Sequence, residues 1–230
     1  MSLSILARAT WHTLAISLPT VFEAVFSEVQ PSACDRRLDI WSRALLRDAD
    51  VRLEVEGLEH IRPDTSYVVM SNHQSLYDIP VLFQALPLKL RMAAKAELFR
   101  VPIWGRALTA AEFVRIDRKR GPEARQALLR AGWAMKRAGV SLWVAPEGTR
   151  SPDGELLPFK TGAFALAHIT QLPILPVRLD GTRSVLRKHG RHVARGMSVR
   201  VSISEPILPS AFPGEIVALA ALVRAQLLAN

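Results

Sequence analysis

The feature that most constrains this chain is the alternation of short apolar runs with longer helical patterns after residue 50. Short runs rich in Val, Ile and Leu predict strands, and helices between them favour parallel pairing, because parallel strands need a crossover connection. The predicted strands are Val51–Val55, Tyr67–Met70, Leu90–Ala94, Phe113–Ile116, Val140–Ala145, Ile174–Leu179 and Val199–Ile203. The predicted helices are Pro80–Leu86, Pro122–Ala138, Gly162–Thr170 and Glu215–Leu228. The pattern therefore predicts an α/β fold with a mainly parallel, mixed sheet of about seven strands flanked by helices.

Two of the predicted strands end just before polar loops. The runs before Ser71 and before Pro146 are apolar throughout rather than alternating, which is typical of strands covered on both faces. In open sheets of this class, functional groups lie just past the carboxyl ends of the strands. We therefore expect functional residues in the loops that follow these two runs.

An apolar, helical region precedes the predicted sheet. Its uncharged stretch between Arg8 and Glu23 has 14 residues, whereas a helix that spans a membrane needs about 20. The segment Pro31–Cys34 does not fit a lipoprotein signal, so we expect neither a membrane span nor export. We expect residues 1–48 to form a helix pair and residues 49–230 to form the main domain. The pair either dips into one membrane leaflet, which the apolar fraction of 49% favours, or packs on the core.

Composition limits the partners and the compartment. Cys34 is the single cysteine, which excludes an internal disulfide and a structural zinc site and favours a reducing compartment. The formal net charge is +9, and arginines outnumber lysines by 24 to 6. Arginine binds phosphate with a planar fork, so this bias indicates a partner that carries phosphates or carboxylates. A GC-rich genome would produce the same bias, so the charge alone does not identify the partner.

The loop after the second predicted strand holds a histidine and an aspartate. His73 and Asp78 are five residues apart, and in one continuous helix this step rotates the side chains by about 140°, so that they diverge. They can meet only if the chain turns between strand and helix, and Pro80 favours a helix start at this point. The plainer alternatives are that Asp78 caps the helix and that His73 bonds to nearby backbone.

The loop after the fifth predicted strand is typical of a phosphate site. Gly148 allows a turn that exposes backbone N–H groups, Thr149 adds a hydroxyl and Arg150 adds a forked cation. An ordinary glycine turn with a solvated arginine is the alternative. Glu147 would repel a phosphate unless it pairs with Arg150 or accepts bonds from loop N–H groups.

Together, the two loops resemble the motifs of the glycerophosphate acyltransferase family, and most closely its bacterial 1-acyl-sn-glycerol-3-phosphate (lysophosphatidic acid) acyltransferase branch. The resemblance extends in order over about residues 50–205. Further segments similar to those of the family are Lys95-Ala96-Glu97-Leu98, Phe113-Val114-Arg115-Ile116-Asp117-Arg118, Pro158-Phe159-Lys160-Thr161-Gly162-Ala163-Phe164 and Leu172-Pro173-Ile174-Leu175-Pro176-Val177. The chain departs from the family at Glu112, where glycine is usual, and at Ala145, where an aromatic residue is usual.

This resemblance implies transfer of a fatty acyl group from a thioester to the free hydroxyl of 1-acylglycerol 3-phosphate, giving phosphatidic acid. His73 would act as general base and Asp78 would orient it, as in a triad whose serine is replaced by the substrate hydroxyl. No Gly-x-Ser-x-Gly motif is present, which favours direct transfer without an acyl-enzyme. The residues expected to bind substrate are Lys95, Arg115, Arg118, Glu147, Gly148, Thr149 and Arg150.

The same resemblance implies partners and a location. Acyl-CoA or acyl-carrier protein would be the co-substrate, and we expect no bound cofactor, no metal and no nucleic acid. We expect a peripheral or monotopic protein on the cytoplasmic face of an anionic membrane. Two alternatives stay open: the same chemistry on glycerol 3-phosphate, another lysophospholipid or lyso-ornithine lipid, and a non-catalytic basic module that binds membranes.

Overall fold

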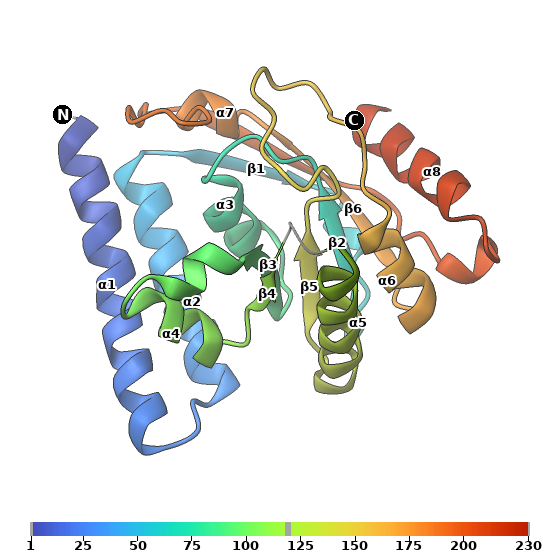
Figure 1. The fold of residues 1–230 in the computed structure, drawn as a ribbon. Coiled ribbons are helices and arrows are strands. Elements are labelled where there is room, and N and C mark those ends of the chain that lie inside the picture. The colour runs from blue at the N-terminus through green and yellow to red at the C-terminus, as the bar shows by residue number, and fades with distance from the viewer. Residues whose placement is uncertain (1, 118–120, 230) are drawn as a thin grey trace.

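The computed structural model describes residues 2–117 and 121–229, and its centre is one seven-stranded sheet (Figure 1). The strands are β1 Arg52–Glu56, β2 Val68–Ser71, β3 Leu90–Lys95, β4 Val114–Ile116, β5 Ser141–Val144, β6 Ile174–Asp180 and β7 Ser198–Ile203. Their order across the sheet is β1-β7-β6-β2-β5-β3-β4. Of the described strand pairs, β6–β7 alone is antiparallel. The predicted α/β fold and its mainly parallel sheet are confirmed.

Helices cover both faces of this sheet (Figure 1). They are α1 Ser2–Phe26, α2 Pro31–Asp48, α3 Asp78–Ala85, α4 Trp104–Ala110, α5 Gly121–Ala138, α6 Gly162–Thr170, α7 Thr182–Val185 and α8 Ile216–Ala229, with 3-10 turns at Leu58–His60, Ala96–Arg100 and Pro209–Ala211. The four helices predicted after residue 50 form, each within two residues of its predicted ends. The sequence does not reveal α4 and α7, because helices of seven and four residues are too short to show a helical period.

The central strands are buried on both faces, as the apolar runs predict. On β2, Val68 and Met70 join the cluster that contains residues of α5, α6 and α8, whereas Val69 joins the cluster of the opposite face. All three side chains are 0% exposed. Because neither face of β2 meets water, no polar residue breaks its apolar run, and the first polar side chains come where the strand ends.

The N-terminal helices α1 and α2 run antiparallel to each other. The His12 imidazole contacts the Asp48 carboxylate near one end of the pair, and the Arg37 guanidinium contacts the Glu23 carboxylate near the other end. α2 packs on α3, and α1 packs on α4. Ile5 of α1 and Leu46 of α2 belong to the same buried cluster as the sheet. The two helices therefore complete the core on this face.

The outer side of α1 is apolar and exposed. Trp11, Phe22 and Phe26 are 67%, 69% and 73% exposed, and the Phe22 and Phe26 rings contact each other with centroids 4.9 Å apart. No helix within the described ranges combines the length and the apolar character that crossing a bilayer requires. Contact of this surface with a membrane stays a prediction.

Candidate active site

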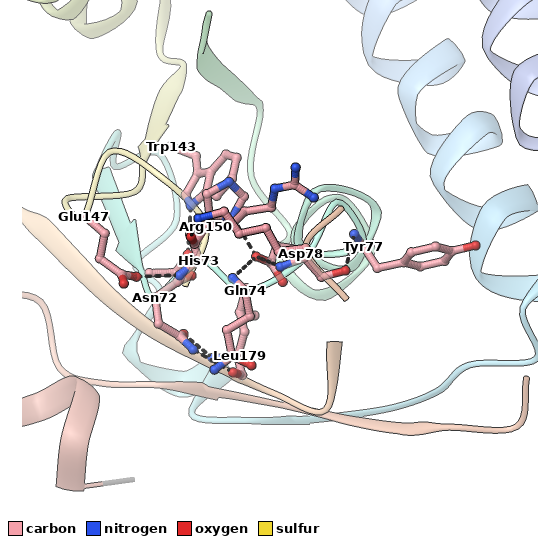
Figure 2. A network of polar contacts seen from close by, with 12 residues as sticks. Asn72, His73, Gln74, Tyr77, Asp78, Trp143, Glu147, Arg150 and Leu179 are labelled. Carbon is pink, nitrogen blue, oxygen red and sulfur yellow. Dashed lines mark hydrogen bonds and ion pairs between the residues drawn. The ribbon is translucent and has the colours of Figure 1, made fainter. Parts of the chain in front are cut away.

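The two predicted loops meet because their strands are neighbours. β2 and β5 pair in parallel, with Met70 opposite Val144, so both chains leave the sheet at the same edge. The backbone N–H of His73 donates to Glu147 Oε1 at 2.7 Å, and the backbone N–H of Ser151 donates to the carbonyl of His73 at 2.7 Å. Figure 2 shows His73 held between the Glu147 loop and Asp78. The second loop therefore fixes the backbone of His73 on both sides.

His73 and Asp78 form a hydrogen-bonded pair. The distance from His73 Nδ1 to Asp78 Oδ2 is 2.7 Å, and the chain turns between them because α3 begins at Asp78. Asp78 is 0% exposed, and its Oδ2 also accepts the backbone N–H groups of Gln74 and Ser75 at 2.8 and 3.0 Å. A carboxylate oxygen that receives these donors assigns the proton of the neutral imidazole to Nδ1. The other ring nitrogen, Nε2, is then the basic one.

Two neighbours fix the environment of this pair. The Trp143 ring meets the His73 ring edge-on, with centroids 5.5 Å apart, and Trp143 Nε1 donates to Ser71 Oγ at 2.9 Å. The Asn72 side chain makes two hydrogen bonds of 2.8 Å with the backbone of Leu179 on β6. The candidate site therefore depends on three adjacent strands, β6, β2 and β5. Sequence reasoning missed Trp143, and its place at the end of an apolar strand gives no signal of this contact.

Glu147 connects two loops through hydrogen bonds and does not line the cavity. Its Oε1 accepts the N–H of His73, and its Oε2 accepts the N–H of Leu157 at 2.9 Å. The side chain is 3% exposed, and burial raises the pKa of this carboxyl above its usual range, while the two N–H bonds oppose the rise. Of the two pairings expected for Glu147, the structure has the bonds to backbone N–H groups. These N–H groups belong to His73 and Leu157, which lie outside the turn that contains Glu147.

The turn at Gly148 brings cations together. Gly148 has a φ of +68°, and a Cβ at this residue would lie 3.0 Å from the ammonium nitrogen of Lys160. Lys188 donates through Nζ to the carbonyl of Arg150 at 2.5 Å. Sequence reasoning placed neither lysine in the site. The PFKTG segment was the available signal for Lys160, whereas Lys188 comes from a distant loop.

A large cavity connects these residues. It has a volume of about 1,380 Å³, and His73, Gly148, Thr149, Arg150 and Lys95 of the predicted set line it. Much of the remaining wall is apolar and comes from α1, α2 and α4. Arg115 is exposed on the edge strand β4 and does not line the cavity, and Arg118 lies outside the described residues.

This arrangement suits acid–base chemistry on a substrate with an apolar tail and a phosphate. His73 supplies a base at the wall of the cavity, and Arg150, Lys160 and Lys188 supply positive charge beside it. Within residues 2–117 and 121–229, no cluster of three or more His, Cys, Asp or Glu side chains could hold a metal ion.

Comparisons with known proteins show the family of this chain. The Acyltransferase family matches residues 52–180, which include both loops. A 1-acyl-sn-glycerol-3-phosphate acyltransferase alpha from Mus musculus is 35% identical over 179 residues, which are 77% of this chain and 63% of that protein. A 1-acyl-sn-glycerol-3-phosphate acyltransferase from Limnanthes alba is 36% identical over 157 residues, which are 68% of this chain and 55% of that protein. The chain thus spans less than two thirds of the length of these relatives.

A solved structure is similar over almost the whole chain. The crystal structure of the 1-acyl-sn-glycerophosphate (LPA) acyltransferase PlsC from Thermotoga maritima has a TM-score of 0.80 and 27% sequence identity. The match covers 98% of this chain and 92% of that one, so it includes the N-terminal helix pair. The family that the motifs of the two loops indicate is therefore confirmed, and the chain belongs to the acyltransferase family.

Proposed function

We propose that this protein transfers a fatty acyl group from a thioester, acyl-CoA or acyl-carrier protein, to the free hydroxyl of 1-acylglycerol 3-phosphate, giving phosphatidic acid. One observation carries the proposal: the His73–Asp78 pair lies at the wall of a large, mostly apolar cavity beside a cluster of cations. The names of the relatives from Mus musculus and Limnanthes alba support this acceptor.

In the proposed reaction, His73 Nε2 takes the proton of the acceptor hydroxyl as the oxygen attacks the thioester carbonyl. The new C–O bond gives a tetrahedral oxyanion, and its collapse breaks the C–S bond. The thiolate that leaves takes the proton back from His73. Asp78 keeps the ring in the correct tautomer and stabilises the imidazolium between these two steps.

The acceptor's phosphate would bind at the Gly148 turn. Thr149 offers a hydroxyl, Arg150 offers a forked cation, and Lys95 and Lys160 add charge to the lining of the same cavity. The acyl chains would lie along the apolar wall from α1 and α2. No resident cofactor takes part in this scheme, and a thioester is already activated for attack by a hydroxyl.

The proposed location is the cytoplasmic face of an anionic membrane. A lipid acceptor is delivered by a bilayer, and the exposed aromatic side chains of α1 offer an apolar surface that fits a leaflet. Basic residues of the chain would add attraction to anionic headgroups, because the net charge is +9. The protein would then bind the surface as a peripheral or monotopic enzyme.

The decisive experiment measures thiol release from acyl-CoA by the purified protein in lipid micelles, with and without 1-acylglycerol 3-phosphate. We expect release that depends on the acceptor and falls by about 10²- to 10⁴-fold in His73→Ala. His60→Ala is the matched control, because His60 does not line the cavity. Activity of the wild type that survives His73→Ala would refute the mechanism.

The acceptor is tested in a second series. Glycerol 3-phosphate, other lysophospholipids and lyso-ornithine lipid replace 1-acylglycerol 3-phosphate in the same assay, with acyl-carrier protein as a second donor. A higher kcat/KM on one of these would replace the proposed acceptor and leave the reaction standing. No release with any pair of donor and acceptor would leave a module that binds membranes without catalysis.

A further inference from the structure

A long segment after β6 carries positive charge without acidic residues. Residues 181–204 contain five arginines, Lys188 and two histidines, and no Asp or Glu. The cations concentrate in residues 187–195, which we call the basic loop. Among the described ion pairs, none involves Arg187, Lys188 or Arg195. The proposed acyl transfer makes no use of these cations.

The basic loop has a defined shape and borders the cavity. Gly190 N–H donates to the Arg187 carbonyl at 2.9 Å, which closes a tight turn, and Ala194 N–H donates to the Val185 carbonyl at 2.9 Å. Lys188 and His189 line the cavity, and Lys188 is bonded to Arg150 of the site. Arg187 is exposed. A ligand that leaves the cavity beside Lys188 would therefore meet the exposed arginines of the basic loop.

The basic loop lies far from the exposed aromatic end of α1. Gly196, directly after the loop, donates to the Ala49 carbonyl at the C-terminal end of α2 at 3.1 Å. That end of α2 lies beside His12 of α1, through the His12–Asp48 contact. Phe22 and Phe26 come 10 to 14 residues later in α1, or about 15–21 Å along its axis at 1.5 Å per residue. The Phe22 and Phe26 end of α1 is therefore separated from the basic loop, whereas Trp11 lies beside His12, at the other end.

We propose that the basic loop binds the 3′-phosphorylated ADP end of the acyl-CoA donor while the thioester lies at His73. The inference rests on the proposed function and names the part of the site that recognises the donor. A phosphomonoester alone carries about −1.5 to −2 charges, and CoA adds a pyrophosphate. An uncharged pantetheine arm separates these phosphates from the thioester, so they would lie toward the exposed cations of the basic loop. A standard-size protein interface covers about 800 Å² on each partner, so a carrier protein of that kind would have to contact more of the surface than this loop.

The test compares binding of free CoA and of 3′-dephospho-CoA by isothermal titration calorimetry to the full-length protein. We expect the wild type to bind CoA about tenfold more tightly than dephospho-CoA. Arg187→Gln combined with Arg191→Gln should weaken CoA binding about tenfold and remove the preference. Arg187→Lys combined with Arg191→Lys keeps the charge and should restore most of the affinity. Arg130→Gln combined with Arg137→Gln on α5 removes the same charge elsewhere and should leave both affinities within twofold.

Three results from the binding and donor comparisons would overturn the inference. The first is a preference for CoA that persists when Arg187 and Arg191 are both Gln. The second is loss of binding to phosphatidylglycerol vesicles in that variant with the CoA preference intact, which would assign the loop to the membrane. The third is an increase in the KM for acyl-carrier protein in that variant without an increase in the KM for acyl-CoA, which would assign the basic loop to a protein donor.

Turnover separates this inference from the proposed function. With acyl-CoA, the Gln variant should show a KM about tenfold higher, with unchanged kcat and an unchanged KM for the lysolipid. CoA binding through the basic loop without acyl transfer to any acceptor would refute the proposed function and keep the inference. Acyl transfer with no response to the Gln variant would refute the inference and keep the function.

Discussion

The role of Asp78 can be tested by the substitution Asp78→Asn, whose effect follows from the geometry of one oxygen. Oδ2 of Asp78 receives three groups: His73 Nδ1 at 2.7 Å and the backbone N–H groups of Gln74 and Ser75. An amide NH2 in that place would face two N–H donors, so the asparagine oxygen should occupy it instead. The imidazole proton then stays on Nδ1, and Nε2 stays basic. The substitution removes the charge of the carboxylate and keeps the tautomer.

The expected loss of activity is therefore moderate. A hydrogen bond to a charged group contributes roughly 1.5–3 kcal/mol, and losing that from the transition state lowers kcat by roughly 10- to 150-fold. Inversion of the tautomer, by contrast, lowers kcat by about 10⁴ in the serine protease triad. Asp78→Ala, which also removes the acceptor for Gln74 and Ser75, should lose more than Asp78→Asn.

The assay is kcat for acyl transfer with both substrates at saturation, measured for the wild type, Asp78→Asn, Asp78→Ala and His73→Ala. Circular dichroism melting curves serve as the control for folding, because Asp78 is buried. A loss near 10⁴ in Asp78→Asn would show that the ring turns over and that the two backbone N–H groups do not hold the oxygen. An unchanged kcat would show that the charge of Asp78 has no part in the reaction.

Three further predictions concern the loop, the turn and the outer helix. Burial raises the pKa of Glu147 in the folded state, so the contribution of this carboxyl to stability is most favourable below pH 4.5 and declines as the pH rises through the folded-state pKa. Chemical unfolding at a series of pH values should therefore show the wild type losing stability relative to Glu147→Gln as the pH rises. A stability difference that stays constant with pH would contradict this prediction. Gly148→Ala places a side chain at a φ of +68°. This substitution should lower the free energy of unfolding by about 1–2 kcal/mol and raise the KM for the acceptor. Gly139→Ala, which is also at positive φ, is the control and should leave the KM for the acceptor unchanged. The double substitution Phe22→Ser and Phe26→Ser should weaken binding to lipid vesicles by at least about tenfold, since each ring contributes roughly 1.5–3 kcal/mol when it is buried. The kcat/KM on a water-soluble short-chain acceptor is the control and should not change. Unchanged vesicle binding would refute a membrane role for these two rings.

Much of the fold was predictable because short-range patterns determine it. The apolar runs that became β2 and β5 are buried on both faces, and their parallel pairing brings the His73 and Gly148 loops to one edge. Helical geometry required a turn between His73 and Asp78 if the two side chains were to meet, and Pro80 favoured a helix start at this point. In these places local and tertiary preferences agree, so a reading of the chain in order is sufficient.

The rest of the site depends on contacts between segments that no local pattern connects. Asn72 bonds to Leu179, which is 107 residues later, and Lys188 bonds to Arg150, which is 38 residues earlier. Glu147 could be recognised as an unusual neighbour for a phosphate, but the donors that satisfy it belong to His73 and Leu157. Arg115 has the right charge and lies on the exposed side of β4, because alternation along a strand decides which side each residue faces.

The two alternatives for the N-terminal helix pair, contact with a membrane leaflet and packing on the core, do not exclude each other. Leu6, Thr10 and Thr13 of α1 line the cavity, while Trp11, Phe22 and Phe26 point outward and are mostly exposed. A helix that is apolar on most of its circumference is normally buried on all sides, yet the domain covers α1 on one side only. An exposed cluster of large rings on the other side is costly in water and is typical of an interaction surface. Core packing on the inner side of α1 and contact with a leaflet on its outer side are therefore compatible. Together they would place the cavity beside the leaflet from which a lipid acceptor enters.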